Sequence, residues 1–113
     1  MERFRAEVEP AGRGGGRVVT ARGELDLAAA DGLWETIEPL LKPGVLVVLD
    51  GTRLSFLDSS GLRVLLQAHK RAESGGAVFR LVAPQAPVQR VLELAGAGSY
   101  LHMRADVTAA LEG

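Results

Sequence analysis

The sequence predicts an α/β fold in which a mixed, mostly parallel β-sheet of about five strands is flanked by α-helices. Strand-like and helix-like segments follow in the order strand, strand, helix, strand, helix, strand, helix, strand, helix. Strands that alternate with helices are typical of a largely parallel sheet. The chain has 113 residues, of which 47% are hydrophobic and 24% charged. This size and composition suit one globular unit, so we expect a single domain over residues 1–113.

The amino-terminal part of the chain predicts two strands joined by a loop. Phe4, Ala6 and Val8 alternate with charged residues, which is the period of a half-buried strand. Residues 10–16 are rich in proline and glycine and predict a loop. Residues 18–25 form the second expected strand. These two strands can make an antiparallel edge, but the pattern leaves the strand order open.

A helix is expected after the second strand. Asp26 can cap it, because its carboxylate can accept a hydrogen bond from a free amide of the first turn. Pro43 and Gly44 end the helix. Its apolar residues recur at helical spacing and predict the face that joins the core: Ala30, Leu33, Trp34, Ile37 and Leu41.

The third strand is the most apolar and leads into a polar turn. Residues 45–49 are apolar without alternation, which predicts a strand covered on both faces. Asp50 is expected to end the strand, and residues 51–53 to turn the chain towards Asp58-Ser59-Ser60-Gly61-Leu62. A second helix then runs to about Glu73, where Ser74-Gly75-Gly76 stops it.

The carboxyl-terminal third predicts two more strands and two more helices. Residues 78–82 form a strand, and Pro84 and Pro87 bracket the start of the next helix, which Gly96 ends. Residues 100–103 are a short last strand. Asp106 caps a final helix over residues 107–111.

The polar turn before the second helix has three possible roles. In the first, Ser59 and Ser60 cap the helix and have no further function. A serine nucleophile needs a base within hydrogen-bond reach, but Gly-x-Ser-x-Gly is absent and His69 falls on the inward face, so we expect no catalytic residue. The third role is a phosphoacceptor, because the dipole at a helix start favours negative charge.

Nothing in the sequence predicts a metal or a cofactor. The chain has no cysteine, which excludes cysteine-based metal sites and thiol catalysis. His69 is interpreted as a core histidine, because His102 is far away in sequence and no metal-ligand spacing appears. We therefore expect no bound metal and no cofactor.

Two motifs resemble those of a known family. Asp58-Ser59-Ser60-Gly61-Leu62, after Leu54-Ser55-Phe56-Leu57, resembles the phosphorylation motif of STAS domains of the anti-sigma factor antagonist type. Gly23-Glu24-Leu25-Asp26 resembles the second signature of that family. The resemblance covers nearly the whole chain and implies a STAS-type fold. It also implies a non-enzymatic protein that binds an anti-sigma factor serine kinase when unphosphorylated, and so releases a sigma factor.

The resemblance also implies which residues act. Family members are phosphorylated on the serine directly after the motif aspartate, here Ser59, and a phosphatase acting on phosphoserine restores the hydroxyl. Helix phase alone favours Ser60, which points furthest from the inward stripe and is the second choice. The expected partner-binding residues lie at the two strand ends and the helix start: Asp26, Asp58, Ser59, Ser60 and Gly61.

Net charge and hydropathy limit the classes of partner that the chain is expected to bind. The net charge of −1 gives no indication of a nucleic-acid partner. The longest apolar run is far shorter than the roughly 20 residues of a membrane span. The first five residues lack the apolar core of a signal peptide, so we expect a cytoplasmic protein without direct membrane insertion. Two alternatives stay open: an accessory STAS subunit of a lipid or other membrane transport complex, and a small-ligand-sensing STAS module that binds a nucleotide or lipid near Asp26 and Asp58.

Overall fold

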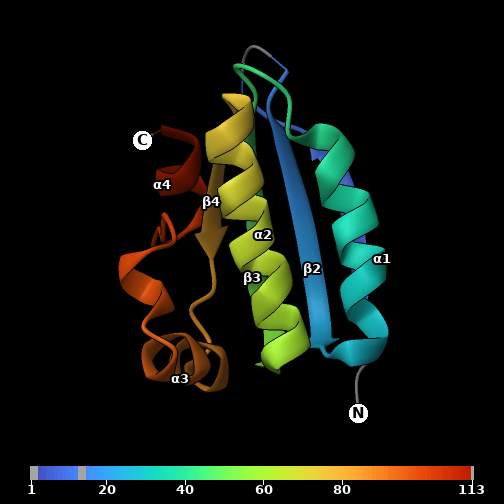
Figure 1. Cartoon of the computed structure of the whole chain (residues 1–113), viewed down its shortest axis with the longest axis vertical. Coiled ribbons are helices and arrows are strands. Elements are labelled where there is room, and N and C mark those ends of the chain that lie inside the picture. The colour runs from blue at the N-terminus through green and yellow to red at the C-terminus, as the bar shows by residue number, and fades with distance from the viewer. Residues whose placement is uncertain (1–2, 13–14, 113) are drawn as a thin grey trace.

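A computed structural model describes residues 3–12 and 15–112 and confirms the α/β fold (Figure 1). Arg13 and Gly14, part of the expected loop over residues 10–16, lie outside the described residues. The elements follow in the order β1 (Arg5–Pro10), β2 (Arg17–Leu25), α1 (Leu27–Ile37), the 3₁₀ turn η1 (Glu38–Leu40), β3 (Leu46–Leu57), α2 (Ser59–Gly75), β4 (Val78–Val82), α3 (Ala86–Leu94), the 3₁₀ turn η2 (Ala97–Ser99) and α4 (Val107–Glu112).

The four strands form one mixed sheet in the order β1-β2-β3-β4. β1 is antiparallel to β2, whereas β2, β3 and β4 run parallel, as the alternation of strands and helices predicts. The expected fifth strand over residues 100–103 is reduced to a bridge between Leu81 and Met103. Two backbone bonds of 2.9 Å hold it, from the Leu81 amide to the His102 carbonyl and from the Arg104 amide to the Leu81 carbonyl.

Both faces of β3 are covered, as its unbroken apolar run predicts. Helices α1 and α2 lie side by side on one face of the sheet (Figure 1) and cover the larger core cluster, which includes Val47 and Leu49. Val48 points to the opposite face and packs with Val82 and Ala110, beneath α4. Alternate residues of one strand therefore join two separate clusters.

β3 is longer than the sequence predicts. The expected end at Asp50 and turn at residues 51–53 are wrong, because the strand continues to Leu57. The partner of Thr20 is Asp50, but the partner of Arg22 is Arg53, so β3 has one extra residue at this point, and a second register shift follows between Gly23 and Glu24. This β-bulge accommodates the turn-like sequence within the strand. Asp50 Oδ1 accepts hydrogen bonds from the Thr52 amide at 3.0 Å and the Thr52 hydroxyl at 2.6 Å.

Most helix limits agree with the predicted caps and stops, but the first helix ends earlier than expected: α1 stops at Ile37, and the 3₁₀ turn η1 follows it before Pro43 and Gly44. Gly76 ends α2 with a φ of 75°, in the left-handed region that favours glycine. Pro87 lies in the first turn of α3, and the Asp106 carboxylate accepts a hydrogen bond of 2.8 Å from the Ala109 amide in α4. Within residues 3–12 and 15–112, no helix has the length and apolarity needed to cross a bilayer.

Candidate functional site

Two aspartates, Asp26 and Asp58, directly follow the ends of the neighbouring strands β2 and β3. Leu25 and Leu57 are paired in the parallel register, so the residues that follow them lie at the same edge of the sheet. Asp26 caps α1 through a bond of 3.1 Å from the Ala29 amide to Oδ1. Asp58 caps α2 through a bond of 3.0 Å from the Gly61 amide to Oδ1. In open α/β sheets, sites gather at the carboxyl ends of the strands, which makes this edge the candidate site.

Asp58 also joins the two helix starts. Its second carboxylate oxygen, Oδ2, accepts a hydrogen bond of 3.0 Å from the Leu27 amide at the start of α1. One carboxylate therefore satisfies an unpaired amide in each of two helices. The sequence does not predict this bond, because it requires knowing that β2 and β3 are neighbours.

Glycines bring the backbone segments of this edge into close contact. Gly61 is buried, and a Cβ there would lie 2.6 Å from both the Leu25 carbonyl oxygen and Leu57 Cδ1. Gly23 has a φ of +96°, and a Cβ there would lie 2.8 Å from the Arg3 carbonyl oxygen. The first turn of α2 can pack on the end of β2 because position 61 has no side chain.

The two serines differ in exposure. Ser59 is exposed and Ser60 is partly buried, and Asp58 rather than either serine caps the helix. The helix-phase expectation that Ser60 points furthest outward is therefore wrong. The expectation fails because α1 packs beside α2, so that Ser60 lines a small pocket with Leu27 and Trp34.

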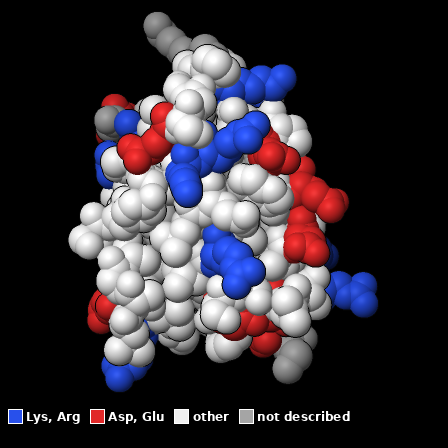
Figure 2. Space-filling model, viewed as in Figure 1, with Lys and Arg blue, Asp and Glu red and all other residues white. Residues whose placement is uncertain are grey.

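Ser59 lies on a groove between α2 and the segment that follows α3. This Ser59 groove has a volume of about 590 Å³. Figure 2 shows Lys and Arg side chains over α2 and Asp and Glu side chains over α1. The groove is therefore apolar with a basic rim, and its side chains include Ser59, Leu62, Arg63, Leu66, Lys70 and Tyr100.

Exposed apolar side chains border this edge, and the sequence analysis did not single them out. Leu27 is 76% exposed and Leu94 is 77% exposed, while Phe56 and Tyr100 are about half exposed. Leu94 departs from the apolar stripe of α3, which includes the buried Val88 and Leu92, and that departure is visible in the sequence. Apolar surface of this kind is common at protein interaction sites.

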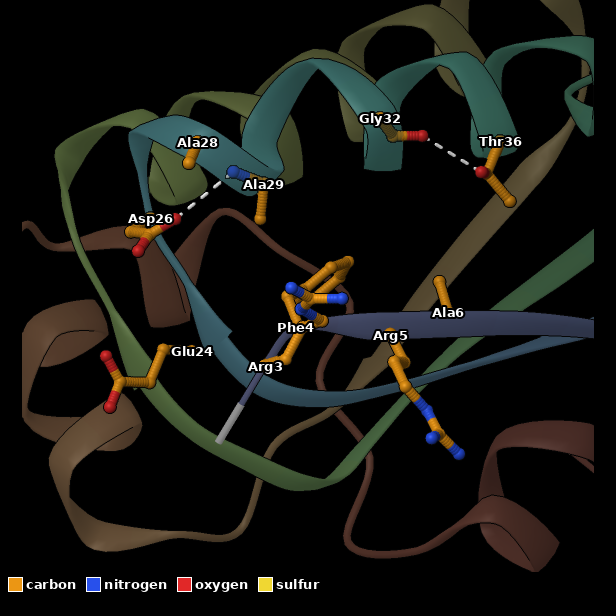
Figure 3. Close-up of a pocket in the computed structure, with 10 residues that line it drawn as sticks. All are labelled: Arg3, Phe4, Arg5, Ala6, Glu24, Asp26, Ala28, Ala29, Gly32 and Thr36. Atoms are coloured by element: carbon orange, nitrogen blue, oxygen red, sulfur yellow. Dashed lines mark hydrogen bonds between the residues drawn. The ribbon is translucent and has the colours of Figure 1, made fainter. Parts of the chain in front are cut away.

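A second cavity, of about 580 Å³, lies between β1 and α1. Figure 3 shows Arg3 and Phe4 beneath α1, whereas Arg5 and Glu24 extend away from the helix. Small residues of α1, such as Ala29 and Gly32, leave the space open. Asp26 lines this cavity, whereas Ser59 lines the Ser59 groove. Two of the predicted partner-binding residues therefore face different cavities.

Comparison with known proteins identifies the family. The STAS domain model matches residues 7–110. An anti-sigma factor antagonist from Mycobacterium paratuberculosis is similar in structure, with a TM-score of 0.83 and 25% identity over 96% of this chain and 92% of that chain. The anti-sigma factor antagonist SpoIIAA in its unphosphorylated form has a TM-score of 0.73 and 25% identity over 89% of each chain. Bacillus SpoIIAA in its phosphorylated form shares the fold, with a TM-score of 0.67 and 23% identity over 89% of this chain and 92% of that chain. The sequence resemblance is thus confirmed, and because the family model spans nearly the whole sequence, the chain belongs to the STAS domain family.

Proposed function

We propose that this protein is an anti-sigma factor antagonist that binds an anti-sigma factor serine kinase while Ser59 is unphosphorylated and loses that partner once Ser59 is phosphorylated. The main support is the exposed Ser59 side chain at the start of α2, on the rim of an apolar groove. Two similar structures at 25% identity are of anti-sigma factor antagonists. In this role the protein is a kinase substrate and binding module in the cytoplasm, and binding of the kinase releases a sigma factor.

Ser59 can be modified without disturbing the fold. The backbone of its turn is held by the Asp58 carboxylate and by the close packing of Gly61, whereas its own side chain is exposed. A phosphate adds about −1.5 to −2 charges, and the helix start stabilises such charge by ~0.3–1 kcal/mol. Arg63 is one turn further along α2 and lines the same groove, so its guanidinium can pair with the phosphate.

The same phosphate would weaken a docked partner. A partner that packs against the neutral hydroxyl, Leu62 and Leu66 must remove water from the phosphate when Ser59 is modified. A loss of ~2.7 kcal/mol already weakens binding a hundredfold. Modification of one exposed hydroxyl is therefore sufficient to switch an interface on and off.

Phosphorylation at Ser59 is tested with purified components. The chain is incubated with candidate anti-sigma factor kinases and ATP, and mass spectrometry locates the phosphate. Ser59→Ala should abolish phosphorylation, and the matched control Ser60→Ala should retain it. A phosphate on Ser60 of the unsubstituted chain, or phosphorylation of Ser59→Ala at the normal rate, would contradict the assignment.

The partner switch is tested by binding. The unphosphorylated chain should capture the kinase in a pull-down and release a sigma factor from it, and the phosphorylated chain should do neither. Treatment with a phosphatase acting on phosphoserine should restore capture. Equal capture by both forms would mean that Ser59 does not control the interface.

The cavity between β1 and α1 favours a second candidate function, the sensing of a small ligand. Its volume of about 580 Å³ lies in the range of ~300–1,000 Å³ typical of ligand pockets. Arg3 beside Phe4 offers a positive charge and an aromatic ring to an anionic nucleotide or lipid headgroup. A thermal-shift screen with nucleotides and lipids tests it, because a true ligand should raise the Tm of the chain and lose this effect in Arg3→Ala.

A further inference from the structure

We propose that His69, Glu73 and His102 form a binding site for a divalent transition-metal ion such as Zn²⁺. One ring nitrogen of each histidine and one carboxylate oxygen of Glu73 lie within 4.8 Å of one another. His69 is ten residues beyond Ser59 on α2, about 15 Å along the helix axis at 1.5 Å per residue. The site is therefore separate from the proposed phosphorylation switch and does not depend on it.

The fold brings together residues that are far apart in the sequence. His69 and Glu73 are one turn apart on α2, and His102 follows η2. The backbone of His102 is held beside β4, because its carbonyl accepts the Leu81 amide at 2.9 Å. The two imidazole centroids are 5.0 Å apart, so two histidines that are far apart in the sequence are neighbours in the fold.

The separations suit a tetrahedral ion. Zn²⁺ binds imidazole nitrogen and carboxylate oxygen at about 2.0–2.2 Å, which places two tetrahedral ligands about 3.4 Å apart. His69 Nε2 and Glu73 Oε1 are 3.1 Å apart. Glu73 and His102 are exposed, so small side-chain rotations can bring the third ligand into place. Water completes the coordination, as in zinc sites with three protein ligands.

The hydrogen bonds of His69 leave one polar atom without a partner. The residue is only 3% exposed, and its Nδ1 atom is buried and forms no hydrogen bond with any described residue. An ion bound through Nε2, the ring nitrogen beside Glu73, cannot also contact Nδ1, so the unpartnered Nδ1 does not mark a ligand of this site. A simple ion pair between His69 and Glu73 explains their contact but gives no role to the neighbouring His102.

An ion can reach the cluster from solvent. His69, Glu73 and His102 line a pocket of about 270 Å³, whose other walls include Ala72, Val78 and Phe79. Two imidazoles and one carboxylate suit zinc, copper or nickel, whereas magnesium and calcium prefer sites made only of oxygen. We therefore expect binding of Zn²⁺ and no saturable binding of Mg²⁺ at the same concentration.

Metal titration of the full, untagged chain tests the site. The protein is first treated with a chelator, and Zn²⁺ affinity is then measured by competition with a chromophoric chelator. We expect one ion per chain. Replacing an outer-shell partner typically weakens metal affinity by ~10–100-fold, so His102→Ala and Glu73→Gln should each weaken it at least as much. Co²⁺ should give the intense visible absorption of a tetrahedral complex.

The controls separate ligand loss from misfolding. Glu93→Gln replaces an exposed carboxylate on α3, outside the cluster, and should leave the affinity unchanged. His102 and Glu73 are exposed, so circular dichroism should show an intact fold in both variants. The absence of saturable Zn²⁺ binding, or unchanged affinity in His102→Ala, would overturn the proposal. Neither result depends on a kinase, so the proposed partner switch is judged separately.

Discussion

The two faces of α2 differ in burial. The inward face is formed by residues such as Gly61, Leu65 and Ala68, which are buried against the sheet. The outward face carries Ser59 and Arg63, which are exposed beside the groove. One helix thus contributes one set of side chains to the core and leaves another set, including a hydroxyl, exposed to solvent. Substitutions on one face should therefore leave the property of the other face intact.

The largest expected effect is on the inward face. Leu65 is fully buried, so Leu65→Ala should lower the free energy of unfolding by ~2–5 kcal/mol, through lost burial and the cavity that remains. A denaturant melt measures this loss. The matched control Gln67→Ala lies on the exposed face and should change the free energy by less than ~0.5 kcal/mol. A loss below ~1 kcal/mol for Leu65→Ala would remove the distinction between the two faces.

The next effect belongs to the outward face. Ser59→Asp places a negative charge at the helix start and should weaken kinase capture about a hundredfold, or ~2.7 kcal/mol, without unfolding the chain. Ser59→Ala removes the proposed phosphoacceptor, so this variant should bind the kinase constitutively. A pull-down measures binding, and circular dichroism checks the fold. Normal capture by the aspartate variant would contradict the switch.

A substitution of Gly61 should affect both faces of α2, because this buried residue is only two positions after Ser59. A methyl group at this position would approach the Leu25 carbonyl oxygen to 2.6 Å, and a backbone atom cannot easily move away. We expect Gly61→Ala to destabilise the chain by ~1–3 kcal/mol and to displace Ser59 as α2 shifts. Denaturant melts and kinase assays on the same sample test both effects. Unchanged stability would mean that α2 does not pack on β2 as closely as described.

The two capping aspartates give the smallest effects and the finest comparison. Loss of a helix cap typically costs about 0.5–2 kcal/mol. Asp26→Ala removes one side-chain bond, to Ala29, whereas Asp58→Ala removes bonds to both Gly61 and Leu27. Asp58→Ala should therefore lower the free energy of unfolding more than Asp26→Ala in parallel melts. An equal loss would mean that the bond between the two helices adds nothing.

Features set by neighbouring residues could be predicted from the sequence, and features set by the strand order could not. Asp26 and Asp106 act as the predicted caps, because capping depends on the next three residues. The exposure of Ser59 over Ser60 depends on how α1 packs against α2, which helix phase cannot supply. The contact of His69 with His102 likewise needs the path of the chain after α3.

The expected strand end at Asp50 failed for a different reason. A glycine and a threonine after an aspartate are common in turns, and the Thr52 amide and hydroxyl do bond to Asp50 as in a turn. The β-bulge absorbs this local bend without ending the pairing of β3 with β2. The local hydrogen bonds are those of a turn, but continued pairing with β2 extends β3 to Leu57.

The amide proton of Leu27 is a natural spectroscopic reporter for the chain. It is donated to the Asp58 carboxylate, which directly precedes Ser59, although Leu27 itself begins a different helix. A doubly charged group on Ser59 would alter the field at that carboxylate, so the nuclear magnetic resonance signal of the Leu27 amide should move as phosphorylation proceeds. Occupancy of the switch could then be followed in real time without any attached label.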